Sequence, residues 1–214
     1  MQSLPTPDEV ASDLGDKVMA GLSAIVHAAM QDLENLRDTQ PSFVSRLSSR
    51  GLANVIHDMM RSHARTVFDE ISGVTLTDKD QYFQIQTTAP DGTIYRIRVK
   101  RHRAAGGISA YPTQAALDFH SQPNDLLSIL GIGTVHLCSG YEWDYNTKTI
   151  VGPVLSLRDG LHGDVVWMID LPKPADGGSG TVTPIVPPKD GPSLPAIKIT
   201  QGDASSNIEG TATP

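Results

Sequence analysis

The chain has 214 residues, a formal net charge of −7 at neutral pH and a single cysteine, Cys138. This length suits one domain with a substantial core. The acidic balance argues against a surface that binds nucleic acid throughout, although a local basic patch can still do so. One cysteine excludes an internal disulfide and a zinc site built from closely spaced cysteines.

Both ends of the chain have a distinctive composition. Met1–Pro5 has no basic segment followed by an apolar one, so it does not read as a signal peptide, and no apolar run approaches the roughly 18 residues of a membrane span. We therefore expect a cytoplasmic protein without a membrane partner. Residues 172–214 contain no Phe, Trp, Tyr, His or Cys but eight of the 15 prolines. We expect this tail to be disordered and residues 1–171 to form a single domain.

Residues 6–72 predict a helical layer. Thr6 and Glu9 can form a capping box around a proline at the first helical position. Apolar residues then recur at spacings of three and four from Leu14 to Leu36, which predicts one long, nearly straight amphipathic helix ending near Asp38. Its small residues, among them Ala20, Gly21 and Ala24, allow close approach of another helix.

A second helical region begins at Pro41 and ends at Gly73, with Gly51 as a candidate break between a short and a long helix. The short connection predicts an antiparallel helical hairpin.

The pattern then changes to the two-residue period of strands, over Tyr82–Thr88 and Ile94–Lys100. A two-residue loop between them would place Ile85 opposite an arginine. A three-residue loop that ends in a left-handed Gly92 pairs Ile85 with Ile97 instead and keeps one face apolar. The second register is therefore expected.

Beyond this hairpin, the sequence predicts a short helix from Pro112–Thr113 to about Phe119 and then strands near 134–143, 150–157 and 165–171. The last three strands have turn residues between them, which favours an antiparallel meander. The expected fold is α+β: an N-terminal antiparallel helical hairpin (6–72) packed on one face of a roughly five-stranded antiparallel sheet (80–171) with one short helix, followed by the Pro/Gly-rich tail.

A basic run at 96–103 is the strongest functional signal of the sequence. In the expected strand, Arg96, Arg98 and Lys100 project from one face about every 6.8 Å, next to polar residues of the preceding strand. The candidate binding residues are Tyr82, Gln84, Gln86, Arg96, Arg98, Lys100, Arg101 and Arg103.

Three interpretations of this basic face stay open: a solvated sheet face, a contact with the acidic first helix or with another subunit, and a nucleic-acid site. The first helix carries seven carboxylates between Pro7 and Asp38. The nucleic-acid interpretation lacks the stacking aromatics, helix-turn-helix or zinc module that such sites use.

Other chemistry-bearing residues are dispersed. His136 and Cys138 share one side of a strand, but side chains at that spacing do not ordinarily hydrogen-bond, and a lone cysteine is commonly buried. His57 and His63 are six residues apart on a helix and point in different directions, and His162 lies in a strand connection with two aspartates. The phosphate-binding, dinucleotide, nucleophile-elbow and zinc-protease motifs are missing. We assign no catalytic residue, metal or cofactor.

The sequence therefore favours a non-enzymatic cytoplasmic interaction or regulatory module that binds a protein partner, with a homodimer through the helical layer as a second use. One alternative is a nucleic-acid-binding protein that uses residues 96–103. The other is a small enzyme with a dispersed site near His136, Cys138 and His162.

Overall fold

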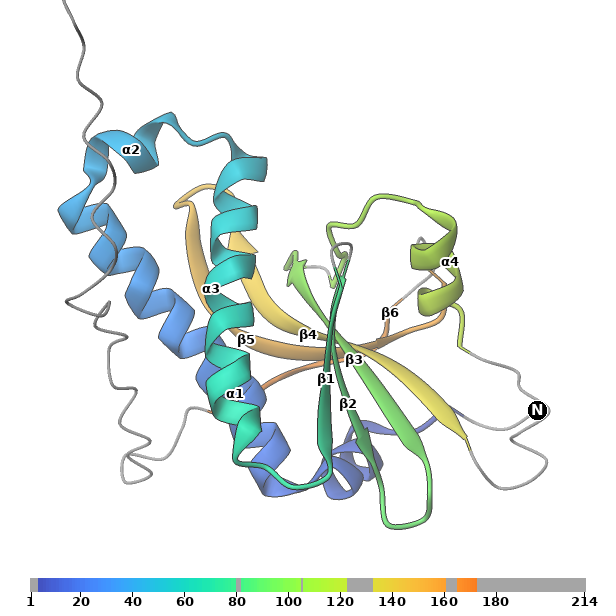
Figure 1. Cartoon of the computed structure of the whole chain (residues 1–214). Coiled ribbons are helices and arrows are strands. Elements are labelled where there is room, and N and C mark those ends of the chain that lie inside the picture. The colour runs from blue at the N-terminus through green and yellow to red at the C-terminus, as the bar shows by residue number, and fades with distance from the viewer. Residues whose placement is uncertain (1–3, 80–81, 105, 123–132, 161–164, 173–214) are drawn as a thin grey trace, which may run out of the picture. The chain divides into compact units, whose positions relative to one another are not determined.

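The fold is α+β, with helices and a six-stranded mixed sheet (Figure 1). It was obtained as a computed structural model, and the residues it describes are 4–79, 82–104, 106–122, 133–160 and 165–172. They belong to one compact unit, Met1–Asp176. The predicted tail, apart from Pro172, lies outside the described residues. The elements are α1 (Pro7–Thr39), α2 (Pro41–Arg46), α3 (Ser49–Asp69), β1 (Val74–Lys79), β2 (Tyr82–Thr88), β3 (Ile94–His102), α4 (Gln114–His120), β4 (Thr134–Asp144), β5 (Thr149–Arg158) and β6 (Val165–Asp170).

Helix α1 begins at the predicted capping box. The Thr6 hydroxyl accepts from the Glu9 amide at 3.3 Å, and the Glu9 carboxylate accepts from the Thr6 amide at 2.7 Å. The prediction of a nearly straight helix is wrong, because Gly15 adopts φ 71° and ψ 161° and kinks α1. A glycine can take this left-handed conformation without the steric cost of a Cβ atom.

Helices α1 and α3 pack side by side and are joined through α2 (Figure 1). A Cβ atom on Gly21 would lie 3.0 Å from the Phe68 ring, so the small residue allows the close approach that the sequence predicts. The break between α2 and α3 lies at Leu47 and Ser48 rather than at Gly51. The Ser48 hydroxyl caps α3 by accepting from the Gly51 amide at 3.0 Å.

The sheet has the strand order β1-β2-β3-β4-β5-β6. The expected register of β2 and β3 is confirmed: Ile85 pairs with Ile97, the Ala89 amide donates to the Thr93 carbonyl, and Gly92 has φ 92°. The β4-β5-β6 meander is antiparallel as expected.

Two sheet predictions are wrong. The sheet has six strands rather than five, because β1 pairs with β2 as an additional edge strand, so the sheet begins before residue 80. The sheet is also mixed, because β3 and β4 are parallel. A parallel pair needs a long crossover connection, and α4 lies in that connection.

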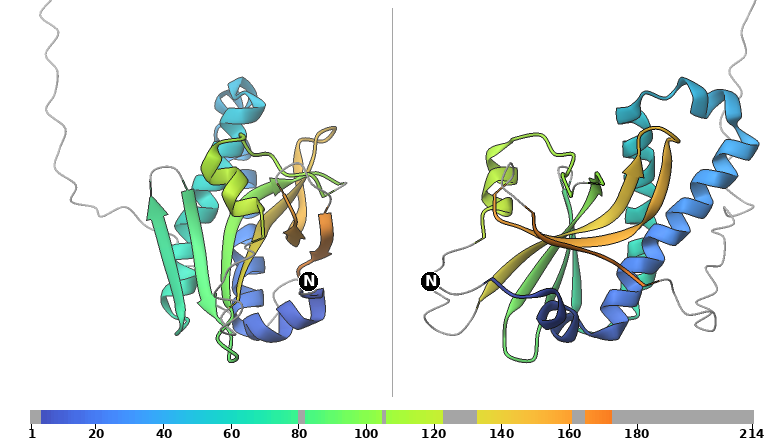
Figure 2. Two further views of the ribbon diagram at one scale, coloured as in Figure 1. Left: turned by 90° about the vertical axis from the view of Figure 1, so that its right-hand side faces the viewer. Right: turned by 180° about the vertical axis from the view of Figure 1, so that it is seen from behind.

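The crossover gives the fold a third layer. The apolar face of the sheet, with Phe83, Ile85 and Ile97, belongs to the core that α1 and α3 share. Helix α4 lies across the sheet from them (Figure 2), where its Phe119 contacts Arg98 and His136 of the polar face. The expectation that the helices pack on one face therefore holds for α1 and α3 but not for α4.

Candidate functional site

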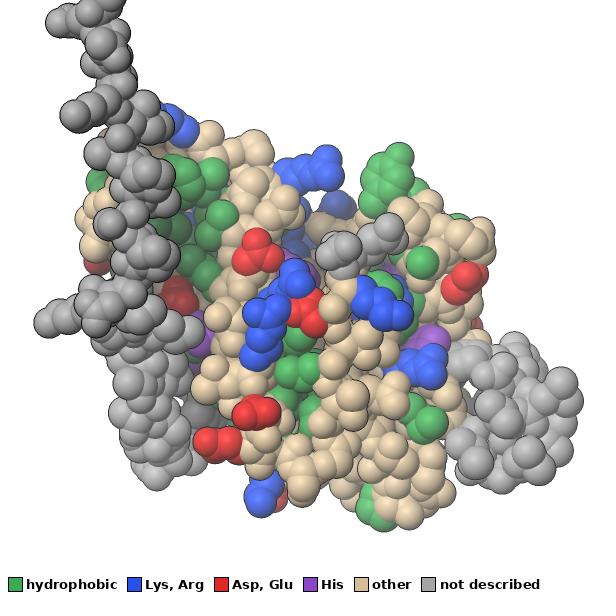
Figure 3. All heavy atoms as spheres, in the orientation of Figure 1, with side chains coloured by type: hydrophobic (Ala, Val, Ile, Leu, Met, Phe, Trp, Pro, Cys, Tyr) green, Lys and Arg blue, Asp and Glu red, His purple; other side chains and the backbone are tan. Residues whose placement is uncertain are grey.

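A cleft of about 400 Å³ lies over the polar face of strands β1 to β3, beside α4. In Figure 3, Lys and Arg side chains gather over α3 and over the strands between α3 and α4. Five of the eight candidate binding residues line this cleft. The lining residues are Thr77, Lys79, Tyr82, Gln84, Gln86, Arg96, Arg98, Ala115, Asp118, Phe119 and His136.

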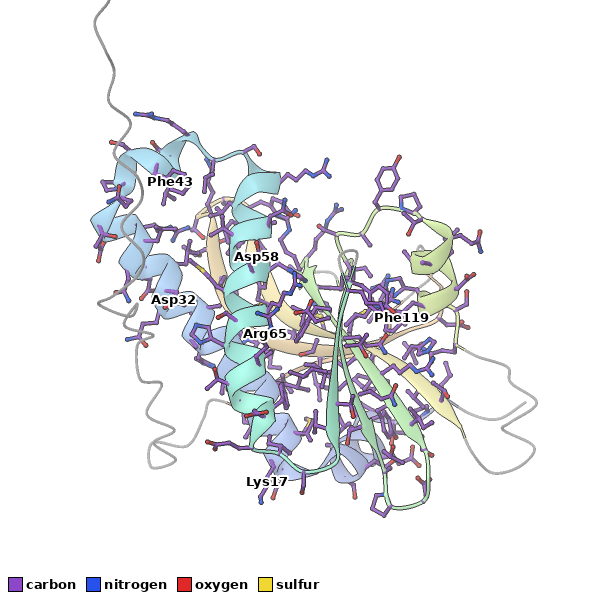
Figure 4. The ribbon with its side chains drawn as sticks, in the orientation of Figure 1. Lys17, Asp32, Phe43, Asp58, Arg65 and Phe119 are labelled. Atoms are coloured by element: carbon purple, nitrogen blue, oxygen red, sulfur yellow. The ribbon has the colours of Figure 1, made fainter. Side chains whose placement is uncertain are left out.

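Arg98 is held in the cleft by aromatic contacts. Its guanidinium carbon lies 3.9 Å from the centre of the Phe119 ring and 4.6 Å from that of Tyr82, both within cation–π range. Its Nη1 donates to the Ala115 carbonyl of α4 at 3.3 Å. Phe119 is labelled in Figure 4, where it lies between α4 and the sheet. These contacts hold Arg98 in place and leave its Nε buried, with no hydrogen-bond partner in the described part of the chain.

Arg96 lies opposite His136 in the parallel register. His136 stacks on Phe119 with ring centres 4.5 Å apart, and its Nδ1 lies 2.6 Å from the Phe119 carbonyl. Because a carbonyl only accepts, Nδ1 carries the proton. Burial lowers the pKa of His136, and Arg96 and Arg98 lower it further. In the neutral ring, Nε2 is then an acceptor, and neither it nor the Arg96 Nε has a hydrogen-bond partner among the described residues.

A smaller cavity of about 170 Å³ adjoins the cleft on its α3 side. The two share Lys79, Tyr82 and Arg98. The other residues that line the smaller cavity come from α3, β2 and β3; they are His57, Asp58, Arg61, Phe83, Val99 and Lys100. Lys100 therefore belongs to this cavity rather than to the cleft.

The last two candidate residues lie outside both hollows. Strand β3 continues through His102, so Arg101 turns toward α3, where its Nη1 lies 3.4 Å from the Ser49 carbonyl. Arg103 is exposed after the end of β3. His102 is fully buried and adds no charge to the surface. The basic run thus divides among a cleft, a cavity and a separate surface.

The acidic first helix does not neutralise the basic face. Among the described residues, no ion pair joins an α1 carboxylate to Arg96, Arg98 or Lys100. Two α1 carboxylates bond elsewhere: Asp13 accepts from the Tyr95 hydroxyl at 2.5 Å, and Asp32 lies 2.6 Å from His63. The intramolecular interpretation of the basic run therefore finds no support in the described part of the chain.

The part of the polar face beneath α4 is closed. Burial raises the pKa of the Cys138 thiol to about 12, and its sulfur lies 3.7 Å from Nδ1 of His120 rather than against His136. His102 is buried with its Nε2 2.9 Å from the Ser156 hydroxyl. A buried thiol with a raised pKa is a poor nucleophile.

No metal centre emerges from the other histidines. His57 lies 3.8 Å from Asp58 and His63 pairs with Asp32, so the two do not converge. In the part of the chain that the structure describes, no group of three or more His, Cys, Asp or Glu residues could hold an ion. His162 lies outside that part.

Sequence reasoning missed Lys79, Asp118 and Phe119 as lining residues, and it considered His136 only together with Cys138. The missing information was the parallel pairing, which sets His136 beside Arg96 and brings α4 over the cleft. The long connection between β3 and β4 that contains a helix was the available signal, because this is the form of a crossover between parallel strands.

Comparison with known proteins identifies no relative: no family model, no curated protein and no solved structure matches this chain. Helices long and apolar enough to cross a membrane are also missing from the described residues.

Proposed function

We propose that this protein is a non-enzymatic cytoplasmic recognition module whose cleft binds an acidic segment of a partner protein. The observation that carries the proposal is the state of Arg96 and Arg98. Their guanidinium groups line one cleft, and among the described residues their buried Nε atoms have no hydrogen-bond partner and no carboxylate forms an ion pair with them. Guanidinium groups bind carboxylates through paired, charge-assisted hydrogen bonds.

The neighbouring polar groups suit a peptide. Tyr82, Gln84 and Gln86 supply a hydroxyl and two amides along the same cleft. Amides both donate and accept, so they can bond to peptide groups while the arginines take the acidic side chains. β1, which contributes Thr77 and Lys79 to the lining, is an edge strand of the sheet.

Single-stranded nucleic acid fits this cleft less well. Binding of single strands relies on aromatic faces on which bases stack. Phe119 is buried between Arg98 and His136, and the guanidinium of Arg98 lies over the Tyr82 ring. The two aromatic rings of the cleft therefore already have partners.

The test uses a fluorescein-labelled ten-residue peptide of alternating Glu and Ser and measures its anisotropy at low salt. We expect saturable binding, and Arg96→Gln should weaken it at least about tenfold, because a hydrogen bond to a charged group contributes about 1.5–3 kcal/mol. The Arg96 side chain makes no hydrogen bond within the described part of the protein, so the variant should fold normally.

Arg103→Gln is the matched control, since Arg103 is exposed, belongs to the same basic run and lies outside the cleft. Its affinity should match that of the unaltered protein. Equal weakening by both variants would show a diffuse charge effect instead of a site. Tighter binding of a dT20 oligonucleotide than of the peptide would favour the nucleic-acid alternative. Self-association through the helical layer is a separate prediction, which light scattering can check.

A further inference from the structure

The smaller cavity beside the cleft has an unusual charge balance. Four cationic side chains line it, contributed by α3, β1 and β3, together with one carboxylate: Arg61, Lys79, Arg98, Lys100 and Asp58. A buried or half-buried cation normally has an anionic partner or a full set of hydrogen bonds, because removing a charge from water is costly.

Lys100 is the least compensated of these cations. Its side chain is half-buried, and burial lowers the pKa of its amine. Among the residues that the structure describes, none forms a hydrogen bond or ion pair with this amine. Ammonium groups carry three donors and no acceptor, so Lys100 brings three donors to the cavity that no described side chain engages.

The two nearby carboxylates do not fill this role. Asp78 forms ion pairs with both Arg61 and Arg65. Asp58 lies on α3 (Figure 4), its side chain is 72% exposed, and its nearest ionic partner is His57 at 3.8 Å. Asp58 therefore lies at the rim of the smaller cavity. The positive charge that no carboxylate compensates there comes from Lys79, Arg98 and Lys100.

We propose that this cavity binds a phosphoryl group. The proposal rests on the proposed function, because it adds a second contact for the ligand of the neighbouring cleft. A phosphoryl group carries up to two negative charges on tetrahedrally arranged oxygens, which matches the uncompensated cations that β1 and β3 contribute to this cavity. Lysine serves phosphate as a point charge, whereas the arginines of the cleft suit flat carboxylates. The volume of about 170 Å³ is far above the ~15 Å³ that one water needs.

The primary test is thermal unfolding in inorganic phosphate against sodium chloride of equal ionic strength. A ligand that binds only the folded state raises its stability by mass action, so phosphate should raise the Tm of the unaltered protein. Lys100→Met should abolish this rise while the variant still folds, because methionine replaces a poorly compensated charge with an apolar chain of similar length. Lys17→Met, an exposed lysine of α1 (Figure 4), is the control and should keep the rise.

Equal Tm values in phosphate and chloride, or an unchanged rise in Lys100→Met, would overturn the proposal. A second arm identifies the source of the phosphoryl group with an otherwise neutral peptide that carries one phosphoserine. Binding at least tenfold tighter than that of inorganic phosphate supports a phosphorylated partner, and equal binding supports a free phosphate compound.

The two proposals can fail separately. The Glu/Ser peptide carries no phosphate and reports on Arg96, which does not line the smaller cavity, whereas inorganic phosphate reports on Lys100, which does not line the cleft. If the peptide fails to bind while phosphate still raises the Tm, the proposal for the cleft is wrong. If the peptide binds while phosphate has no effect, the proposal for the smaller cavity is wrong.

Discussion

The polar face of the sheet has an open part, at the cleft and the smaller cavity, and a part that is covered by α4. The cationic and imidazole side chains of the two parts differ in their hydrogen bonding. Beneath α4 and the β3–α4 connection, His102 bonds to Ser156 and the Arg158 guanidinium donates to the Gly106 carbonyl, although the buried Nε2 of His120 has no hydrogen-bond partner among the described residues. In the open part, Arg96 and Lys100 have no such partner within the described chain. A fold satisfies most of the polar groups that it buries for its own stability, so the unpaired cations of the open part support the proposed ligand.

The substitution with the largest expected effect on stability is at Gly140 of β4, where this strand lies beside β3. A Cβ atom there would lie 2.0 Å from the Lys100 carbonyl oxygen, and the φ of 151° also disfavours other residues. We expect Gly140→Ala to lower the free energy of unfolding by about 3 kcal/mol or more, because backbone atoms must move. Urea denaturation measures the loss.

Gly152 on β5 is the matched control, since a Cβ atom there meets nothing within 4 Å. Gly152→Ala should change stability little. Similar losses in the two variants would contradict the role assigned to the close approach at Gly140.

We expect acid to lower the stability of the protein through histidines that are buried in the covered part. Burial lowers the pKa of His102 and of His120 to about 4, from 6.5 in the unfolded chain. Between these values the unfolded state binds more protons, so the stability contributed by the neutral rings is complete above pH 6.5 and is lost as pH falls toward 4. We expect a few kcal/mol of loss between pH 7 and pH 4 in urea titrations.

His120→Gln removes one of the buried histidines whose pKa is lowered. Its stability should fall less steeply over the same pH interval. Parallel curves for the variant and the unaltered protein would show that His120 does not contribute to the pH dependence.

A smaller loss of stability is expected when a buried polar group loses its hydrogen-bond partner. Ser156→Ala leaves Nε2 of the buried His102 without its partner, while Nδ1 keeps its contact with the Lys100 carbonyl, and the loss should cost about 1–3 kcal/mol. Ser45→Ala, at an exposed hydroxyl of α2, should cost far less. Chemical denaturation of both variants gives the comparison, and an equal cost would mean that the His102–Ser156 contact adds no stability.

Local elements of the fold could be predicted from the sequence because their determinants are neighbours in the chain. The Thr6–Glu9 capping box and the register of Ile85 with Ile97 depend on a few adjacent residues and were predicted correctly. The Gly15 kink was missed, because the apolar period continues through it. The edge strand β1 was missed although Val74 and Leu76 alternate with polar residues, because it is short and directly follows a helix.

The candidate site could be predicted only in part, for the same reason. Tyr82, Gln84 and Gln86 were placed beside Arg96 and Arg98 because one hairpin register determines all five. The other walls of the cleft and cavity come from distant residues of α3, α4 and β4. Their proximity depends on the parallel pairing and on helix packing, which period and spacing within a single segment do not encode.

The parallel pairing of β3 with β4 also sets the order in which the cleft is assembled during folding. One wall, β1 to β3, consists of hairpins whose partners are close in sequence. The other wall requires the chain between β3 and β4 to close before its contacts repay the lost entropy. We expect the hairpin wall to form early and the α4 wall late. A partially folded chain would then display its arginines without a cleft, and the proposed selective binding would begin only when the crossover has docked.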